Sequence, residues 1–424
     1  MSKPEEITSI SQPQSAGEFR VLMVLSRRVA VPPGNGRERT LSFIMQTCQD
    51  MAKVEVVHLE SWLQAKTLRG LLSMAGQALA QLLRGRAPSL QALVFHDRAR
   101  LRELDAVIRN SSPDVIYLDG VRLGQYAPML AGRGASRIVC DFDDLMSRRM
   151  RNRAGAGQPL ALGYLGSHVP AFARRVLESR WIGGLVQAYE GHALAGLERR
   201  VARSCDCVVL VSSIEADQLR ATVPGARVVA IPPFVSRHRA FRPLSDVQRF
   251  VFLGSSDFLQ NRLTIDYLID LWRRRRPAIP LHLYGTIRVQ EHLPEAVELR
   301  GYCADLADVY TPGSVLLAPS FAPGGVKTKV LEAISHGVPA IGTPATFEGF
   351  PTMAADLCLD ADELEAFVLD PSTRLAAVNA AARALAGQVM RTHSEQAVSA
   401  QWREVLRGPG RAVDTGAAVR SPGT

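Results

Sequence analysis

The sequence predicts an α/β fold in which two domains, each built on a parallel sheet, face a central cleft. Three observations carry this prediction. The chain has 424 residues, and at roughly 100–200 residues per domain two large domains are the simplest division. Short apolar runs alternate with helical patterns, and the alternation restarts after a polar stretch at 237–249. The hydrophobic fraction of 47% and the charged fraction of 21% are those of a folded protein and exclude wholesale disorder.

The first domain is expected at 19–240, after a leader at 1–18 that is expected to be disordered. Its strands are predicted where short apolar runs stand between turn-prone segments, which is typical of buried parallel strands. These runs are 19–25, 54–59, 114–118, 137–142, 207–211 and 228–231. Helical patterns separate them, including most of 61–110. Strands that alternate with helices predict a parallel, Rossmann-like sheet.

The second domain is expected at 241–390, and it repeats the pattern of the first. Its strand candidates are 249–253, 281–284, 297–301, 315–318 and 339–342. A helix at 391–407 is expected to cross back to the first domain, and 408–424 is expected to be a disordered tail. Ligands of such sheets bind at the carboxyl ends of the strands. A cleft between two such ends can hold two substrates, which favours a group-transfer enzyme, although a hinged binding protein would share the architecture.

The charge of the chain is unusual in its composition. There are 50 basic and 41 acidic side chains, a net charge of +9, and only five of the basic residues are lysines. In a chain that uses arginine by default, a lysine is expected where the compact ammonium is needed. The excess charge predicts either acidic partners, such as phosphates or anionic lipid, or merely a solvated basic surface. The sequence has no nucleic-acid-binding motif, so no nucleic acid partner is expected.

Several classes of protein are excluded by simple patterns. No apolar run reaches 18 residues, so no membrane-spanning helix is expected. The amino terminus lacks the apolar core of a secretory signal, so we expect a cytoplasmic protein, either free or bound peripherally to the inner face of the plasma membrane. The segment 71–86 is either a membrane-surface helix or a helix packed on its own domain. The six cysteines form no CxxC pair or zinc spacing, so reduced thiols and no metal are expected.

The most informative segment is 318–343. A predicted strand ends at 318, a loop with Gly324 and Gly325 follows, and a helix is predicted to begin near Val326. A glycine turn that enters a helix presents free N–H groups and the positive end of the helix dipole, which favours an anion such as a diphosphate. Lys327 and Lys329 lie on the same first turn. Glu332 lies one turn further along, where its carboxylate can accept bonds from two neighbouring hydroxyls of a ribose.

This segment resembles the donor-binding signature of glycosyltransferase family 4, whose members have the two-domain GT-B fold, and in particular bacterial exopolysaccharide-type sugar transferases. The matching residues are Gly325, Lys329, Leu331, Glu332, Ala333, Gly337, Pro339, Thr343, Glu348 and Gly349. The resemblance implies that Glu332 binds the ribose and that Lys329, with Lys327, contacts the diphosphate. Many family members have a sugar-binding glutamate eight residues before the ribose-binding one. Gly324 stands there in this chain, so backbone N–H groups of 324–326 are expected to serve instead.

A second donor-side match is 252–262. It resembles the loop of the same family that approaches the donor phosphates. Gly254 lets the backbone come close, Ser255 and Asn261 fall in the same motif, and Arg262 is a candidate diphosphate clamp. Tyr302 falls in the stretch that typically holds the nucleotide base, where it either contacts the base or packs.

The first domain supplies the matches on the acceptor and sugar side. A loop with Gly34 and Gly36, followed by Arg39, resembles the family loop after the first strand and is expected near the donor phosphates and the acceptor. Asp141, Asp143 and Asp144 end a predicted strand. The resemblance implies no catalytic metal, so Asp144 is expected to contact sugar or acceptor hydroxyls, or alternatively to cap a helix.

The resemblance implies a hexosyltransferase-type enzyme that moves a sugar from a nucleotide-diphosphate sugar to an acceptor hydroxyl, with retention of configuration. The acceptor would be a glycan, a lipid-linked sugar or a small molecule, in polysaccharide, glycolipid or metabolite biosynthesis. No cofactor is expected beyond the nucleotide sugar as co-substrate. Lys329, Glu332 and Arg262 are the residues predicted to support catalysis. Two alternatives remain, a sugar-nucleotide isomerase resembling the 2-epimerases and a non-catalytic sugar-nucleotide-binding subunit.

Overall fold

A computed structural model describes most of the chain. The described residues are 19–31, 36–59, 61, 68–131, 136–155, 179–236, 239–289, 291–321, 325–350 and 355–408. The expected leader at 1–18, residues 409–424 of the expected tail, and the candidate site residues Gly34 and Gly324 lie outside them.

The first sheet has six parallel strands in the order β2-β1-β3-β4-β5-β6. Its strands are β1 (Arg20–Leu25), β2 (Lys53–His58), β3 (Val115–Asp119), β4 (Arg137–Asp143), β5 (Cys207–Leu210) and β6 (Val228–Ala230). Each apolar run singled out in the first domain forms one of these strands, with ends that shift by a residue or two. The α/β fold class is therefore confirmed for this half.

Helices cover both faces of this sheet. They are α1 (Gly36–Gln49), α3 (Leu68–Leu83), α4 (Leu90–Leu93), α5 (Arg98–Ser111), α6 (Gly120–Gly124), α7 (Ala127–Leu130), α8 (Met146–Gly155), α10 (Arg180–Ser204) and α11 (Ser213–Thr222). In β1, Val21 and Met23 pack in one cluster with α1, while Leu22 and Val24 pack in another with α5 and α10. Successive strand residues point to opposite faces, so an all-apolar run is what a strand buried on both faces requires.

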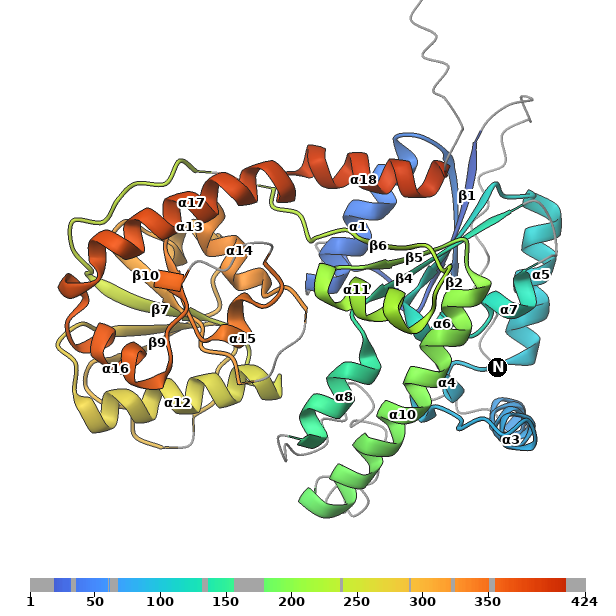
Figure 1. Cartoon of the computed structure of the whole chain (residues 1–424), viewed down its shortest axis with the longest axis horizontal. Helices are drawn as coiled ribbons and strands as arrows, with labels where there is room; N and C mark the ends of the chain where they lie inside the picture. Colours follow the sequence, from blue (N-terminus) through green and yellow to red (C-terminus); the bar gives the residue numbers. More distant parts are fainter. Residues whose placement is uncertain are drawn as a thin grey trace, which may run out of the picture.

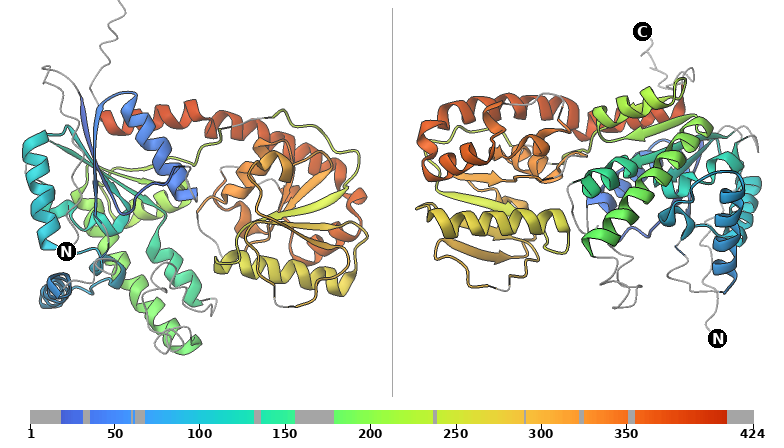
Figure 2. Two further views of the ribbon diagram at one scale, coloured as in Figure 1. Left: turned by 180° about the vertical axis from the view of Figure 1, so that it is seen from behind. Right: turned by 60° about the horizontal axis from the view of Figure 1, so that its bottom comes forward.

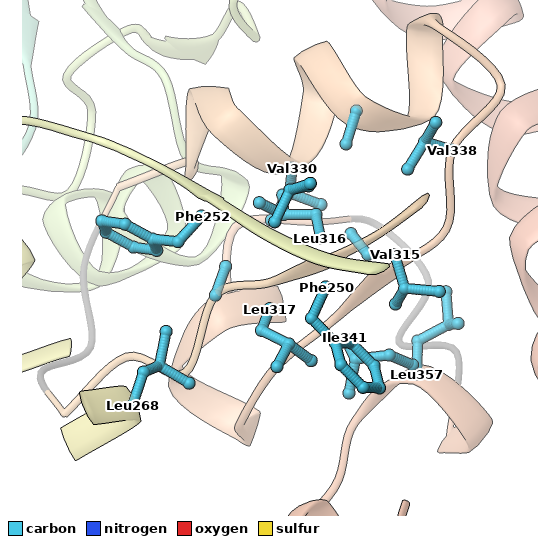
Figure 3. Packing of buried hydrophobic residues seen from close by; sticks show 14 of the residues in the cluster. Phe250, Phe252, Leu268, Val315, Leu316, Leu317, Val330, Val338, Ile341 and Leu357 are labelled. Atoms are coloured by element: carbon cyan, nitrogen blue, oxygen red, sulfur yellow. The ribbon is translucent and has the colours of Figure 1, made fainter. Parts of the chain in front are cut away.

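The second sheet has five parallel strands in the order β11-β10-β7-β8-β9. Its strands are β7 (Arg249–Leu253), β8 (Leu281–Tyr284), β9 (Val297–Gly301), β10 (Ser314–Leu317) and β11 (Ala340–Ile341). The helical elements around it are α12 (Leu259–Arg275), α13 (Leu306–Val309), α14 (Thr328–Ser335), α15 (Pro344–Phe347), α16 (Ala361–Leu369), α17 (Leu375–His393) and the short 3₁₀ turns Ala355–Leu357 and Pro371–Thr373. Figure 3 shows part of the core, in which Phe250 and Phe252 of β7 lie near Leu316 of β10 and Val330 of α14.

Two segments join the domains and run beside each other. Residues 231–248 form no helix or strand where they are described, and α17 is followed directly by α18 (Glu395–Arg407). The two connections meet where the Val235 N–H donates to the His393 carbonyl over 2.8 Å. Trp402 of α18 packs in the core of the first domain with Tyr117 of β3, with ring centroids 6.0 Å apart. Figure 1 shows α17 over the second domain and α18 over the first.

The described helices include none that is both long enough and apolar enough to cross a membrane. Within 61–110 the helical pattern is broken into α3, α4 and α5. Figure 2 shows α3 set at the edge of the first domain, away from the second. All six cysteines are unpaired thiols, as the sequence predicts.

Candidate active site

The helix α14 begins beside the cleft after the glycine loop. Gly325 has a left-handed φ of 63°, and the helix starts at Thr328 rather than near Val326, because Lys327 is still extended. No side chain caps this amino end. A side chain on Gly349 would place its Cβ 2.6 Å from the Gly325 carbonyl. The glycine that follows Glu348 therefore lets the chain pass close to the loop that leads into α14.

Lys329 is half-buried between α14 and the loop after β7. Its Nζ donates to Asn261 Oδ1 over 2.8 Å and lies 4.1 Å from the centroid of the Phe252 ring. Burial lowers the pKa of Lys329 to about 7, and Glu332 opposes that shift only in part. A Cβ on Gly254 would lie 2.8 Å from Asn261 Nδ2. The structure thus brings Gly254 and Asn261 together with Lys329, which lies 68 positions after Asn261 in the sequence.

The other donor-side candidates lie on more open surface. Arg262 is exposed and donates through Nε to the Ser256 carbonyl over 3.2 Å. Ser255 donates through Oγ to the Thr286 carbonyl over 3.3 Å. Tyr302 is 82% exposed, whereas Tyr310 is buried and donates through its hydroxyl to the Lys329 carbonyl. Asn261 therefore contacts Lys329 directly, whereas Arg262 and Tyr302 lie on exposed surface.

Glu332 lies on the wall of a cavity between the two domains. The cavity has a volume of about 410 Å³. Its lining comes from α1, the connection at 233–236, the segment before α13, and α14: Gly36, Arg39, Thr40, Pro233, Phe234, Val235, Ser236, Ala304, Asp305, Leu306, Thr328, Leu331, Glu332, Ser335 and His336. Arg39 Nη1 donates to Glu332 Oε1 over 2.8 Å. Burial raises the pKa of Glu332, and the Arg39 guanidinium acts against that rise.

The first domain contributes a charge cluster at the carboxyl ends of β3 and β4. Arg37 donates to Asp119 over 2.6 Å, to Asp141 over 2.9 Å and to Asp143 over 3.4 Å. Burial alone would lower the pKa of Arg37, but these three carboxylates hold it well above its ordinary value. Burial raises the pKa of Asp141, and Arg37 opposes that rise. Asp143 has a left-handed φ of 66° where β4 is irregular, and its side chain is partly exposed.

A second cross-domain contact involves α8. Arg148 forms an ion pair with Glu348 of the second domain and another, over 3.5 Å, with Glu215 of α11. The neighbouring Arg149 forms an ion pair with the buried Asp144. Asp144 is therefore engaged inside the first domain. Burial lowers the pKa of Lys327 to about 8, and Arg149 lowers it further while Glu348 raises it.

Arg37, Asp119, Arg148 and Glu215 were not recognised from the sequence. Asp119 ends a predicted strand as Asp143 does, so a signal existed for that residue. The carboxylates do not form a metal centre. In the part of the chain that the structure describes, no group of three or more His, Cys, Asp or Glu side chains could hold a metal ion. The Arg37 guanidinium stands among the carboxylates, where a cation would have to lie.

Comparisons with known proteins agree with this architecture. Residues 247–386 match the model of a family described as glycosyl transferases group 1. No curated protein matches the chain significantly. The fold is similar to sucrose-phosphate synthase from Thermosynechococcus elongatus, with a TM-score of 0.58 and 14% identity over 92% of this chain and 98% of that one.

Two further solved structures are similar over nearly their whole length. Anabaena HepE in complex with UDP and glucose has a TM-score of 0.54 and 14% identity, over 92% of this chain and 99% of that one. A glycosyltransferase from Rickettsia africae has a TM-score of 0.56 and 10% identity, over 92% and 98%. The chain thus has the GT-B fold, and residues 247–386 carry a glycosyl transferases group 1 match.

Proposed function

We propose that this protein is a glycosyltransferase that moves a sugar from a nucleotide-diphosphate sugar to an acceptor hydroxyl, with retention of configuration. One observation carries the proposal. Glu332 faces a cavity between the domains, and Lys329 lies on the same helix, whose amino end is uncapped. A sugar nucleotide needs two kinds of group close together. A carboxylate binds the two ribose hydroxyls, and cations with helix N–H groups bind the diphosphate.

The cavity supports a nucleoside at this position. A volume of about 410 Å³ falls within the range of roughly 300–1,000 Å³ that is common for small-molecule sites. In the proposed pose the ribose hydroxyls donate to Glu332, and the base lies toward Asp305 and Leu306. HepE has been crystallised with UDP-glucose, which makes a uridine nucleotide the first donor to test.

The diphosphate would lie against the amino end of α14. Lys327 and Lys329 are both half-buried, and desolvation lowers the pKa of each. A diphosphate reverses that effect, because its charge favours the ammonium form. The cations and helix dipole would then stabilise the leaving group as its bond to the sugar breaks. Arg262 would reach the same phosphates after a rotation of its exposed side chain.

The acceptor would approach from the first domain. Asp143 is partly exposed at the end of β4, and Arg39 reaches from α1 to the cavity. We propose attack on the same face from which the diphosphate leaves. The new glycosidic bond forms as the sugar–phosphate bond breaks, and the hydroxyl proton passes to a diphosphate oxygen. The acceptor class would be a glycan, a lipid-linked sugar or a small molecule, and no further cofactor is proposed.

The test is a panel of nucleotide sugars incubated with the purified chain, with and without candidate acceptors. Release of nucleoside diphosphate that depends on the acceptor, with a new glycoside of unchanged anomeric configuration by NMR, supports the proposal. An isomerised donor would instead identify the protein as an isomerase. Tight binding of the donor without turnover would identify it as a binding subunit. Glu332→Gln and Lys329→Met should each weaken donor binding about ten-fold or more. The exposed residues Glu404 and Lys53 offer Glu404→Gln and Lys53→Met as matched controls.

A further inference from the structure

The helix α3 exposes an apolar face to solvent. Leu68, Leu72, Ala75, Leu79 and Leu82 are all exposed, and their spacing of three and four residues puts them on one side of a helix. Leu72 is 64% exposed, and Leu83 beside this stripe is 80% exposed. A helix on the surface of a soluble domain normally turns charged or polar residues outward. No charged residue occurs between 70 and 83.

The opposite face of α3 is anchored to the domain. Gly70 is buried, and Ser73 accepts a hydrogen bond from the Arg98 N–H over 3.2 Å. The leucine stripe is thus presented outward by a helix that is held in place. The helix thus packs on its own domain through one face and leaves the other face exposed.

A second apolar group lies on the first turns of α10. Trp181 is 87% exposed, and Ile182 and Leu185 are also exposed. Further along α10, the Tyr189 hydroxyl donates to the Pro88 carbonyl over 2.9 Å, which ties the helix to the segment after α3. Figure 1 shows α3 and the first turns of α10 on the side of the domain opposite α18.

Two arginines stand beside the leucine face of α3. Arg84 and Arg86 directly follow α3 and are exposed. Arg86 lies two residues before Pro88, where the Tyr189 hydroxyl ties the segment after α3 to α10. An apolar strip beside exposed cations, with an exposed tryptophan on a second helix, has the features of a surface that enters the interface of an anionic bilayer.

We propose that the leucine face of α3 and the exposed apolar residues of α10, flanked by Arg84 and Arg86, dock this protein on an anionic lipid bilayer. A second copy of the chain fits less well. A symmetric dimer would bring each patch against itself, so Arg84 and Arg86 of the two copies would be brought toward like charge and repel. Anionic headgroups complement the arginines while the leucines enter the acyl boundary.

Vesicle flotation of the full chain tests the proposal without any need for turnover, so its outcome is independent of the proposed enzymatic activity. The protein should float with vesicles of phosphatidylcholine mixed with phosphatidylglycerol and much less with phosphatidylcholine alone. Leu72→Gln with Leu79→Gln should lower the bound fraction about ten-fold or more. Arg84→Glu with Arg86→Glu should remove the preference for the anionic vesicles. On binding, Trp181 fluorescence should shift to the blue, and Trp181→Phe should lose that change.

The matched control is Leu299→Gln with Leu369→Gln, which changes two exposed leucines of the second domain and should leave flotation intact. Thermal unfolding of each variant checks that the fold is kept, which is expected at exposed positions. Absence of flotation by the unmodified protein, or flotation unaffected by the α3 leucine changes, overturns the proposal. So does a dimer in lipid-free solution that the same leucine changes convert to a monomer, because the face would then belong to a second copy.

Discussion

Arg39 of the first domain donates to Glu332 of the second across the cleft, over 2.8 Å, although 293 positions separate them in the sequence. The pair closes one side of the cavity and occupies one oxygen of the carboxylate that we propose for the ribose. Glu332 is largely shielded from solvent, while more than half of the Arg39 side chain is exposed. Arg39 can therefore swing away at little cost, and a ribose can take its place.

The first prediction concerns this exchange. Arg39→Met frees the Glu332 carboxylate, so we expect a nucleoside diphosphate to bind several-fold more tightly by isothermal titration calorimetry. The variant should also be less stable by about 1 kcal/mol or less in chemical denaturation, because the ion pair that it removes is partly exposed. Weaker nucleotide binding would instead assign Arg39 to the donor phosphates, as the sequence resemblance implies.

The pH dependence of donor binding follows from the buried lysines. The pKa of Lys329 is about 7 in the free protein, and a bound diphosphate favours the protonated form. Affinity should therefore be constant below pH 7 and fall as the pH rises through 7, by at most about ten-fold per pH unit for one proton. In Lys329→Met this fall should disappear, leaving only the fall above pH 8 that Lys327 produces. A flat profile in the unmodified protein would contradict the assignment of both lysines.

Stability should respond to Lys329 in the opposite sense. Because its pKa is lowered from 10.5 to about 7, the unfolded chain binds the proton more tightly than the folded protein does. The folded state is therefore penalised most below pH 7, and the penalty fades as the pH rises toward 10.5. Lys329→Met should stabilise the fold at pH 6 by about 1–3 kcal/mol, and by much less at pH 10. An equal gain in stability at both pH values, or an equal gain in the Lys53→Met control, would show that the lowered pKa of Lys329 is not the cause.

Glu348 lies outside α14 but should affect the pKa of the neighbouring Lys327. It raises the pKa of Lys327 and also pairs with Arg148 of the first domain. In Glu348→Gln the pKa of Lys327 should fall below its present value of about 8, so the part of the fall in donor affinity that Lys327 produces should move to lower pH than in the unmodified protein. The measurement is the nucleotide dissociation constant between pH 6 and pH 9. Glu404→Gln should leave that curve in place, and an unshifted curve in Glu348→Gln would show that the pair serves only to hold the domains.

The sequence was a good guide where local chemistry decides the structure. Apolar runs such as 20–25 become strands buried on both faces, and Gly325 takes the left-handed conformation before α14. The segment around Lys329 and Glu332 was identified because its residues are close along the chain.

The remaining contacts could not be predicted because they depend on how the domains meet. Arg37 and Arg39 are two residues apart on α1, yet one lies among carboxylates of its own sheet and the other spans the cleft. Two positions on a helix face opposite ways, and the sequence does not say which faces the cleft. Arg148 and Glu348 are 200 positions apart, so only the tertiary fold pairs them. Which face of α3 points outward likewise depends on its neighbours in the tertiary structure.

The last prediction tests the loop that leads into α14. In Gly349→Ala the new Cβ would lie 2.6 Å from the Gly325 carbonyl and 2.9 Å from the Val326 Cα. Both neighbours are backbone atoms, so the loop itself must move, at a cost of about 1–3 kcal/mol in stability. Because the loop sets the amino end of α14, nucleotide affinity should fall about ten-fold or more, to be measured by calorimetry.

Gly387→Ala is the matched control. Its Cβ meets nothing nearer than 3.6 Å, and its position within α17 should stabilise the helix by about 0.5–1 kcal/mol without affecting nucleotide binding. Unchanged nucleotide binding in a folded Gly349→Ala protein would mean that the diphosphate does not depend on this loop.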